Sequence, residues 1–143
     1  MKKGLLLSAL FAAFGWVNAQ NDPAQQQPKS NAVISFETTT HSFGNVIEGQ
    51  IATYEFVFKN TGTDPLTLTN VQASCGCTTP KWPREAIAPG QSASVIAEYN
   101  SNGRPGTFTK NINVKSNGGE VNLTISGNVV KEPEKPLSPI IIK

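Results

Sequence analysis

The sequence predicts an all-β domain, an antiparallel β-sandwich of about seven to eight strands, over residues 32–130 of the 143. Apolar and polar residues alternate in several runs, which is the period of strands that bury one face. Clusters of Gly, Pro, Asn and Asp separate the runs at short intervals, as in sandwiches. No run of comparable length has a helical period. The alternating apolar positions are Tyr54, Phe56 and Phe58; Val95, Ala97 and Tyr99; Phe108, Ile112 and Val114; and Val121, Leu123, Ile125 and Val129.

Turn signals divide the domain into its elements. Asn60–Pro65 ends the first long run, Ala88–Gly90 precedes the next, and Asn117–Gly119 has the composition of a tight hairpin turn. The stretch 74–85 contains no alternation and is expected to form a loop. In chain order, strands are expected near 32–38, 43–48, 50–59, 65–72, 86–88, 91–100 and 106–116, with an eighth near 119–130.

Residues 1–19 have the three parts of a secretory signal peptide and are expected to be cleaved. Lys2 and Lys3 give a positive start, an apolar run extends from Leu5 to Val17, and small residues lead to Ala19. The run is shorter than the ~20 residues that span a bilayer, which disfavours a membrane anchor. The sequence therefore predicts export to the periplasm, cell surface or extracellular space, with no transmembrane segment after cleavage.

Signal cleavage would leave a chain without net charge. The full sequence holds 12 basic and 10 acidic residues, and removal of Lys2 and Lys3 leaves 10 of each. A neutral domain without a Lys/Arg cluster has no broad positive electrostatic field that would attract nucleic acid or anionic lipid. The expected partner is another protein of the cell envelope.

Two polar segments that contain prolines flank the domain. Residues 20–31 lack apolar periodicity and predict a flexible linker. Residues 131–143 form a Pro-rich C-terminal tail, because three prolines oppose a helix or a central strand. Ile140, Ile141 and Ile142 are unusual in such a tail. They are candidate partner-binding residues that add to a sheet edge, or an incidental apolar part of a solvated segment.

Cys75 and Cys77 are the only cysteines. In an oxidising compartment such a pair tends to form a disulfide. The Cα atoms of an extended Cys-Gly-Cys segment lie ~6–7 Å apart, so ring closure needs a bend at Gly76, which lacks a Cβ. So small a ring restricts the unfolded chain little and is expected to be easily reduced. The pair is therefore a candidate redox or disulfide site, or a structural staple of its loop.

Metal binding is the third alternative for the two cysteines, because thiolates suit Cu(I) and Zn²⁺. Zinc takes about four ligands, and the mature chain would add only His41 and no Met. A complete site would require two chains, and no cofactor is predicted.

Trp82 lies between Pro80 and Pro83 and is the only Trp that remains after signal cleavage. A tryptophan in a loop covers one end of the core or anchors a partner, so Trp82 is a candidate partner-binding residue.

Short motifs around the cysteine pair punctuate the domain. They are Phe43-Gly44, Glu48-Gly49, Phe58–Gly62, Pro65-Leu66, Ser74–Pro80, Trp82-Pro83, Ile87–Gly90, Gly106–Lys110 and Ser126–Val129. Over about residues 36–129 the chain resembles the bacterial domain of unknown function 1573 family, and the Cys-Gly-Cys-Thr block is the most specific part of the resemblance. This likeness implies an immunoglobulin-like fold similar to hydin-like (ASH) and major-sperm-protein-like domains, which are mostly protein-binding or scaffolding modules. It implies no activity and no catalytic residues.

The sequence as a whole predicts an exported, non-enzymatic binding or interaction module. No Gly-rich phosphate loop, pair of catalytic carboxylates or Ser-His-Asp order stands out, so no catalytic residue is predicted. The alternative is a thiol-based redox or metal-binding protein that uses the Cys-Gly-Cys loop.

Overall fold

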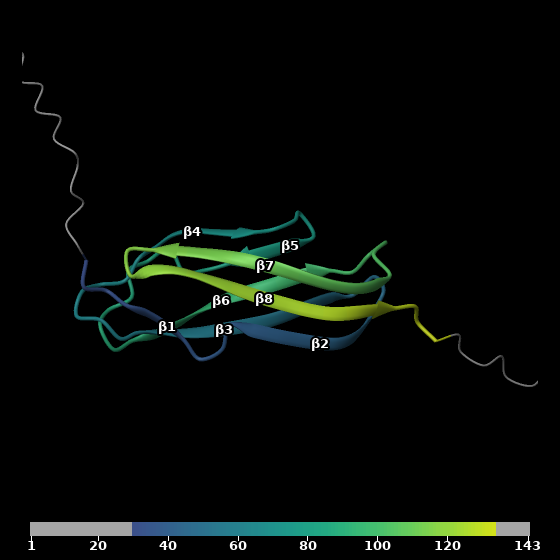
Figure 1. Cartoon of the computed structure of the whole chain (residues 1–143), viewed down its shortest axis with the longest axis horizontal. Coiled ribbons are helices and arrows are strands. Elements are labelled where there is room, and N and C mark those ends of the chain that lie inside the picture. The colour runs from purple at the N-terminus through teal and green to yellow at the C-terminus, as the bar shows by residue number, and fades with distance from the viewer. Residues whose placement is uncertain (1–29, 134–143) are drawn as a thin grey trace, which may run out of the picture.

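Two four-stranded sheets face each other in the computed structural model, which describes residues 30–133 (Figure 1). One sheet has the order β1-β3-β6-β5 and the other β2-β8-β7-β4. Among the described residues there is no helix, and hence none long and apolar enough to cross a membrane. The strands are β1 (Ile34–Phe36), β2 (Thr40–Ile47), β3 (Ile51–Asn60), β4 (Leu68–Ala73), β5 (Thr78–Lys81), β6 (Ser92–Asn100), β7 (Gly106–Ser116) and β8 (Gly119–Val130). The predicted all-β sandwich is confirmed.

The core lies between the two sheets and follows the period of two read from the sequence. In β6, for example, Val95, Ala97 and Tyr99 are buried, while the residues between them are more exposed. The expected apolar positions all belong to the core or pack against it, with Tyr54 and Val121 partly buried at its margin. Burial of alternate residues on both inner faces is what holds the sheets together.

One strand pair departs from the predicted antiparallel arrangement. β2 runs parallel to β8, from Thr40 beside Thr124 to Ile47 beside Val130. The other pairs of named strands are antiparallel. The parallel pair arises because the chain passes from β1 in one sheet to β2 in the other without reversing its direction.

The strand expected at 86–88 is wrong. Ile87 makes only an isolated bridge with Leu66, through backbone hydrogen bonds of 2.8 and 2.9 Å. The sheet instead gains β5 within 74–85, the stretch expected to be a loop. Both differences follow from β6, because it pairs with Thr78–Lys81 and leaves the segment after them to cross toward the other sheet.

Asn60 is a fully buried polar residue that fixes this crossing segment. Its Nδ2 donates to the carbonyl oxygens of Asp64 (2.8 Å) and Ile87 (3.0 Å). Its Oδ1 accepts from the backbone N–H of Gly62 at 3.0 Å. The side chain therefore ties the end of β3 to the turn after it and to the loop that leads into β6.

The domain begins slightly earlier than the sequence indicated. Asn31 N–H donates to Asp64 Oδ2 at 2.9 Å, and Asn31 O accepts from Thr63 N–H at 3.0 Å. Ser30 Oγ accepts from Asn117 Nδ2 at 3.2 Å. These last two residues of the expected 20–31 linker are thus bound to the domain. The remainder of that linker, the 1–19 signal segment and residues 134–143, with the three isoleucines, lie outside the described residues.

Candidate functional site

β5 is an edge strand, and its composition suits that position. Thr78 and Thr79 are β-branched residues that favour strands. Pro80 lacks an N–H, which an edge strand tolerates where that group would face away from its neighbour. Pro80 stands opposite Ala97 of β6. Lys81 Nζ and Glu98 Oε1 form an ion pair of 2.6 Å between the two strands.

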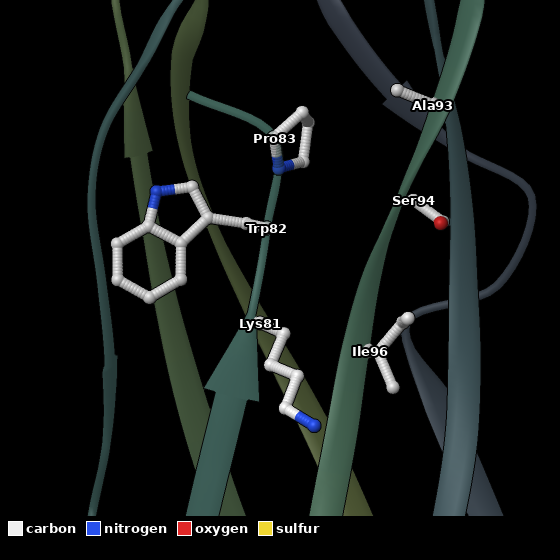
Figure 2. A pocket seen from close by; sticks show the side chains of 6 residues that line it. All are labelled: Lys81, Trp82, Pro83, Ala93, Ser94 and Ile96. Atoms are coloured by element: carbon white, nitrogen blue, oxygen red, sulfur yellow. The ribbon is translucent and has the colours of Figure 1, made fainter. Parts of the chain in front are cut away.

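The pairing of β5 with β6 ends at Lys81 and Ile96, although β6 begins four residues earlier, at Ser92. Beyond that pair the two segments diverge and leave a hollow of about 410 Å³ (Figure 2). Its lining is mostly apolar. The residues around it are Lys81, Trp82, Pro83, Ala93, Ser94 and Ile96. We call this feature the β6 hollow.

The backbone of β6 presents to this hollow hydrogen-bonding groups that have no partner within residues 30–133. Along a strand, successive residues direct their N–H and C=O groups alternately to the two neighbours. Asn100 N–H donates to Cys77 O at 2.9 Å, so the even-numbered residues of β6 face β5. Asn60 N–H donates to Gln91 O at 2.9 Å, so the odd-numbered residues face β3. The backbone groups of Ser92 and Ser94 therefore form an open sheet edge.

Trp82 forms one wall of the β6 hollow and also closes the core. The residue is partly buried and packs against the core cluster. Its indole is directed away from β6 (Figure 2). The Arg84 guanidinium lies 3.8 Å from the centre of the ring, a geometry in which cation and ring attract each other. Nε1 is buried and has no hydrogen-bond partner among the described residues.

Cys75 and Cys77 are joined in a disulfide at the start of β5. Their Cα atoms are 5.3 Å apart, and a backbone hydrogen bond from Thr78 N–H to Cys75 O (3.4 Å) closes the turn. Gly76 bends as expected, but its φ lies outside the left-handed region and an added Cβ would meet no atom within 4 Å. The bend therefore does not require glycine.

The two sulfur atoms of the disulfide differ in their surroundings. Cys77 is buried at 8% exposure, whereas Cys75 is partly exposed. Thr78 Oγ1 is close to both sulfurs, 3.8 Å from Cys75 Sγ and 4.0 Å from Cys77 Sγ. Thr78 is itself buried, at 4% exposure. Cys75 is thus the more exposed of the two residues, and one hydroxyl, slightly nearer to Cys75 Sγ, lies close to both sulfurs.

His41 is separated from the cysteine loop by the full width of a sheet. It lies on β2, whereas β4, which leads into the loop, is the opposite edge of the same sheet. Its ring stacks on Tyr54 with 3.5 Å between centroids. Burial lowers the pKa of His41, because it penalises the charged form. Within residues 30–133, no three His, Cys, Asp or Glu side chains gather in a way that could hold a metal ion.

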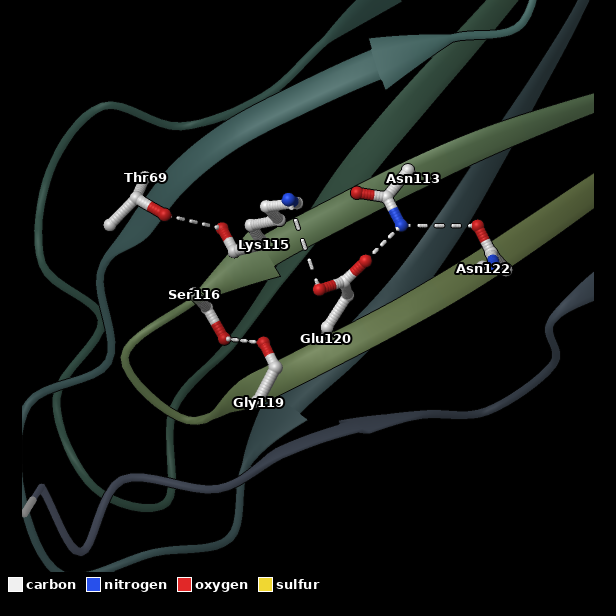
Figure 3. A network of polar contacts seen from close by, with 7 residues as sticks. All are labelled: Thr69, Asn113, Lys115, Ser116, Gly119, Glu120 and Asn122. Carbon is white, nitrogen blue, oxygen red and sulfur yellow. Dashed lines mark hydrogen bonds and ion pairs between the residues drawn. The ribbon is translucent and has the colours of Figure 1, made fainter.

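A second hollow, of about 450 Å³, lies over β4, β7 and β8 on the outer face of the other sheet. Its polar side chains bind one another. Asn113 Nδ2 donates to Glu120 Oε1 (2.6 Å) and Asn122 Oδ1 (3.2 Å), and Lys115 Nζ lies 4.0 Å from Glu120 Oε2 (Figure 3). These contacts engage Asn113, Lys115, Glu120 and Asn122 with one another.

The structure brings the three described candidates of the sequence to one edge, with the disulfide at the beginning of β5 and Trp82 just after its end. Sequence reasoning missed Ser92, Ser94, Ile96 and Thr78. Thr78 and Thr79 were the one local indication of a strand at β5. The Cys and Pro residues around them favoured a loop more strongly.

Comparisons with known proteins agree with this architecture. The family described as "Protein of unknown function (DUF1573)" matches residues 34–129. No curated protein matches the chain in sequence. Among solved structures, a protein of unknown function from Porphyromonas gingivalis W83 is similar at a TM-score of 0.61 and 18% identity, over 76% of this chain and 51% of that one.

Two further structures share the fold. An ASH/PapD-like domain of human CEP192 has a TM-score of 0.62 and 10% identity, over 92% of this chain and 100% of that one. The secreted serine protease VesC of Vibrio cholerae has a TM-score of 0.51 and 18% identity, over 68% of this chain and 23% of that one. The chain thus spans about half of the P. gingivalis structure and about a quarter of the protease. At these identities the likeness concerns the fold alone.

Proposed function

We propose, on the premise that the chain belongs to the DUF1573 family, that it is an exported, non-enzymatic binding module for an extended segment of another protein. The segment lies along the open edge of β6 and places one apolar side chain in the β6 hollow. The partner is a protein of the cell envelope.

The open edge beside the hollow is the observation that carries this proposal. A bare sheet edge offers a row of donors and acceptors that an incoming extended chain can pair with, and alternate side chains of that chain then read adjacent pockets. Ser92 and Ser94 supply the backbone groups, and Ile96, Ala93 and Pro83 supply apolar contacts. One site therefore supports both affinity and selectivity.

The charges around the hollow favour an uncharged segment. Lys81 is paired with Glu98 across the two strands, and Arg84 lies over the Trp82 ring. Lys81 is the charged residue of the lining, and because Glu98 pairs with it, the lining itself has little unmatched charge to select an anion or a cation. A segment with small or branched apolar residues at alternate positions suits such a lining.

Export and the choice of partner rest on the sequence. Residues 1–19 have the pattern of a cleaved signal, and the remaining chain has no net charge. The likeness to an ASH/PapD-like domain is compatible with a binding role.

Selection of linear peptides from a displayed random library tests the proposal. Peptides that bind the purified protein are measured against Ile96→Ser and the matched Ile51→Ser. Ile51 is on β3 of the same sheet and is 62% exposed, but it does not line the hollow. We expect Ile96→Ser to weaken binding about tenfold, from lost apolar contact, and Ile51→Ser to leave it unchanged.

Ser94→Pro tests the backbone part of the same proposal. Its N–H faces the open edge, so proline removes a free donor and leaves the β3–β6 hydrogen bonds in place. Thermal unfolding and circular dichroism confirm the fold of the variant. Peptides that bind Ser94→Pro and Ile96→Ser as well as they bind the wild-type protein would contradict strand addition at this edge.

A further inference from the structure

We propose that the Cys75–Cys77 disulfide is active in thiol–disulfide exchange, with Cys75 Sγ as the sulfur that an incoming thiolate attacks. This activity is separate from the binding of an extended segment, because the disulfide lies at one end of β5 and the β6 hollow at the other.

The exchange step conserves electrons and needs no further oxidant or reductant. The incoming thiolate sulfur forms a bond to Cys75 Sγ, and the bond between Cys75 Sγ and Cys77 Sγ breaks. The bonding pair remains on Cys77 Sγ, which becomes a thiolate and takes a proton from solvent. In the reverse step Cys77 Sγ, once deprotonated, attacks Cys75 Sγ and releases the incoming thiol.

Exposure selects the sulfur that is attacked. Cys75 is partly exposed, whereas Cys77 is 8% exposed and belongs to the core cluster. Attack on a disulfide depends on access to the sulfur as well as on thiol acidity. A thiolate from solvent therefore reaches Cys75 first, and Cys77 is the leaving group.

Thr78 is a positioning residue for the leaving group. Its hydroxyl oxygen lies 3.8 Å from Cys75 Sγ and 4.0 Å from Cys77 Sγ. These are the hydrogen-bonding contacts of the hydroxyl within residues 30–133. When Cys77 Sγ gains negative charge, this hydroxyl can donate to it. A hydrogen bond to the charged form lowers the pKa of a thiol, and a thiol of lower pKa leaves faster.

The loop keeps its place when the disulfide opens. Ser74 N–H donates to Asn111 O at 2.8 Å, and Asn100 N–H donates to Cys77 O at 2.9 Å. These backbone bonds tie the residues on both sides of Gly76 to β7 and β6. Cys77 Sγ therefore stays near Cys75 Sγ after exchange, and the reverse step remains available.

Glutathione is the first probe of this chemistry. The oxidised, purified protein is exposed to it, the products are trapped with acid, and fragment mass spectrometry locates the adduct. We expect glutathione on Cys75 and a free thiol on Cys77. An adduct chiefly on Cys77, or no adduct under conditions that open an unfolded Cys-Gly-Cys peptide, would overturn the proposal.

Single variants separate the two sulfurs. With oxidised glutathione, the Cys75 thiol in Cys77→Ser should react about tenfold faster than the Cys77 thiol in Cys75→Ser, because of its exposure. Equal rates in two folded variants would remove the basis for choosing Cys75. A second comparison identifies the source of the incoming thiol. The wild-type protein is treated in parallel with reduced glutathione and with a cysteine-containing peptide. A faster reaction with the peptide points to a protein thiol, and an equal or slower reaction points to a small thiol.

Thr78→Val and Thr78→Ser test the positioning role. Thr78→Val keeps the shape and removes the hydroxyl, so the exchange rate should fall several-fold and the pKa of the released Cys77 thiol should rise. Thr78→Ser should restore both. Unchanged pH dependence in Thr78→Val would show that Thr78 acts only through packing.

Discussion

Lys81 and Ile96 form the last residue pair between β5 and β6. Beyond this pair β6 continues beside β3 alone among the described residues, and Trp82 and Pro83 line the hollow next to it. The position of this pair therefore decides both that β6 has an open edge and that an apolar hollow adjoins the edge.

Gly62 and Gly76 should respond differently to alanine. An added Cβ at Gly62 would lie against Asn31 O and 2.7 Å from Ala32 Cα, both backbone atoms. Overpacking of this kind destabilises by about 1–3 kcal/mol, whereas Gly76→Ala, in open space, should change stability by less than about 0.5 kcal/mol. Urea denaturation of the two variants measures the difference. Equal losses would show that the contact of Gly62 with residues 31–33 is not tight.

Removing the disulfide should leave a folded protein. A three-residue ring restricts the unfolded chain by only about 1.6 kcal/mol in the loop-entropy account. The double variant Cys75→Ala/Cys77→Ala should therefore lose about that much unfolding free energy, and wild-type protein in reductant should lose a similar amount. Failure of both to fold would make the disulfide a structural requirement of the domain.

Replacement of Asn60 should destabilise the domain far more than replacement of a partly exposed asparagine that donates as many hydrogen bonds. Asn60→Ala leaves the Gly62 N–H and the Asp64 carbonyl without their side-chain partner and removes one of the two donors to the Ile87 carbonyl, so it should cost about 3 kcal/mol. Asn113, on the outer sheet face, also donates two side-chain hydrogen bonds. Asn113→Ala is the matched control and should cost less than about 1 kcal/mol. Similar midpoints in thermal unfolding would contradict the linking role of Asn60.

His41 should make stability fall in mildly acidic solution. Burial holds the pKa of His41 in the folded protein below its ordinary value, which is about 6.5. The unfolded chain therefore binds the proton more readily, and unfolding becomes easier as pH falls through about 6.5 toward the lower folded pKa. His41→Phe preserves an aromatic ring beside Tyr54 and should no longer show the part of the acid-induced fall in stability that comes from His41. Identical changes in melting temperature between pH 7.5 and 5.5 would argue against it.

Most of the fold could be predicted because burial on one face leaves a period of two in the sequence. Phe56 and Phe58 in β3 and Leu123 and Ile125 in β8 are such positions, and all four are buried. The prediction of a strand at 86–88 was wrong because it rested on a single large apolar residue, Ile87. β5 was missed because its strand state comes from pairing with β6, while Pro80 reads as a loop residue in isolation.

The candidate site could be predicted only in part. Cys75, Cys77 and Trp82 stand out by residue type, and the structure gathers them at one edge. Ser92 and Ser94 do not stand out, because their role depends on where a neighbouring strand stops. Thr78 gains its role from contact with both sulfurs, which needs the turn that the disulfide closes.

Amide hydrogen exchange along β6 tests the central claim most directly. In the free protein the Ser94 N–H should exchange rapidly, while the Val95 and Ala97 N–H groups, which face β3, should be protected. Addition of a selected peptide should then slow exchange at Ser94 and leave Val95 unchanged. Protection of Ser94 in the free protein, or no change there when a peptide binds, would contradict an open edge that receives an extended segment.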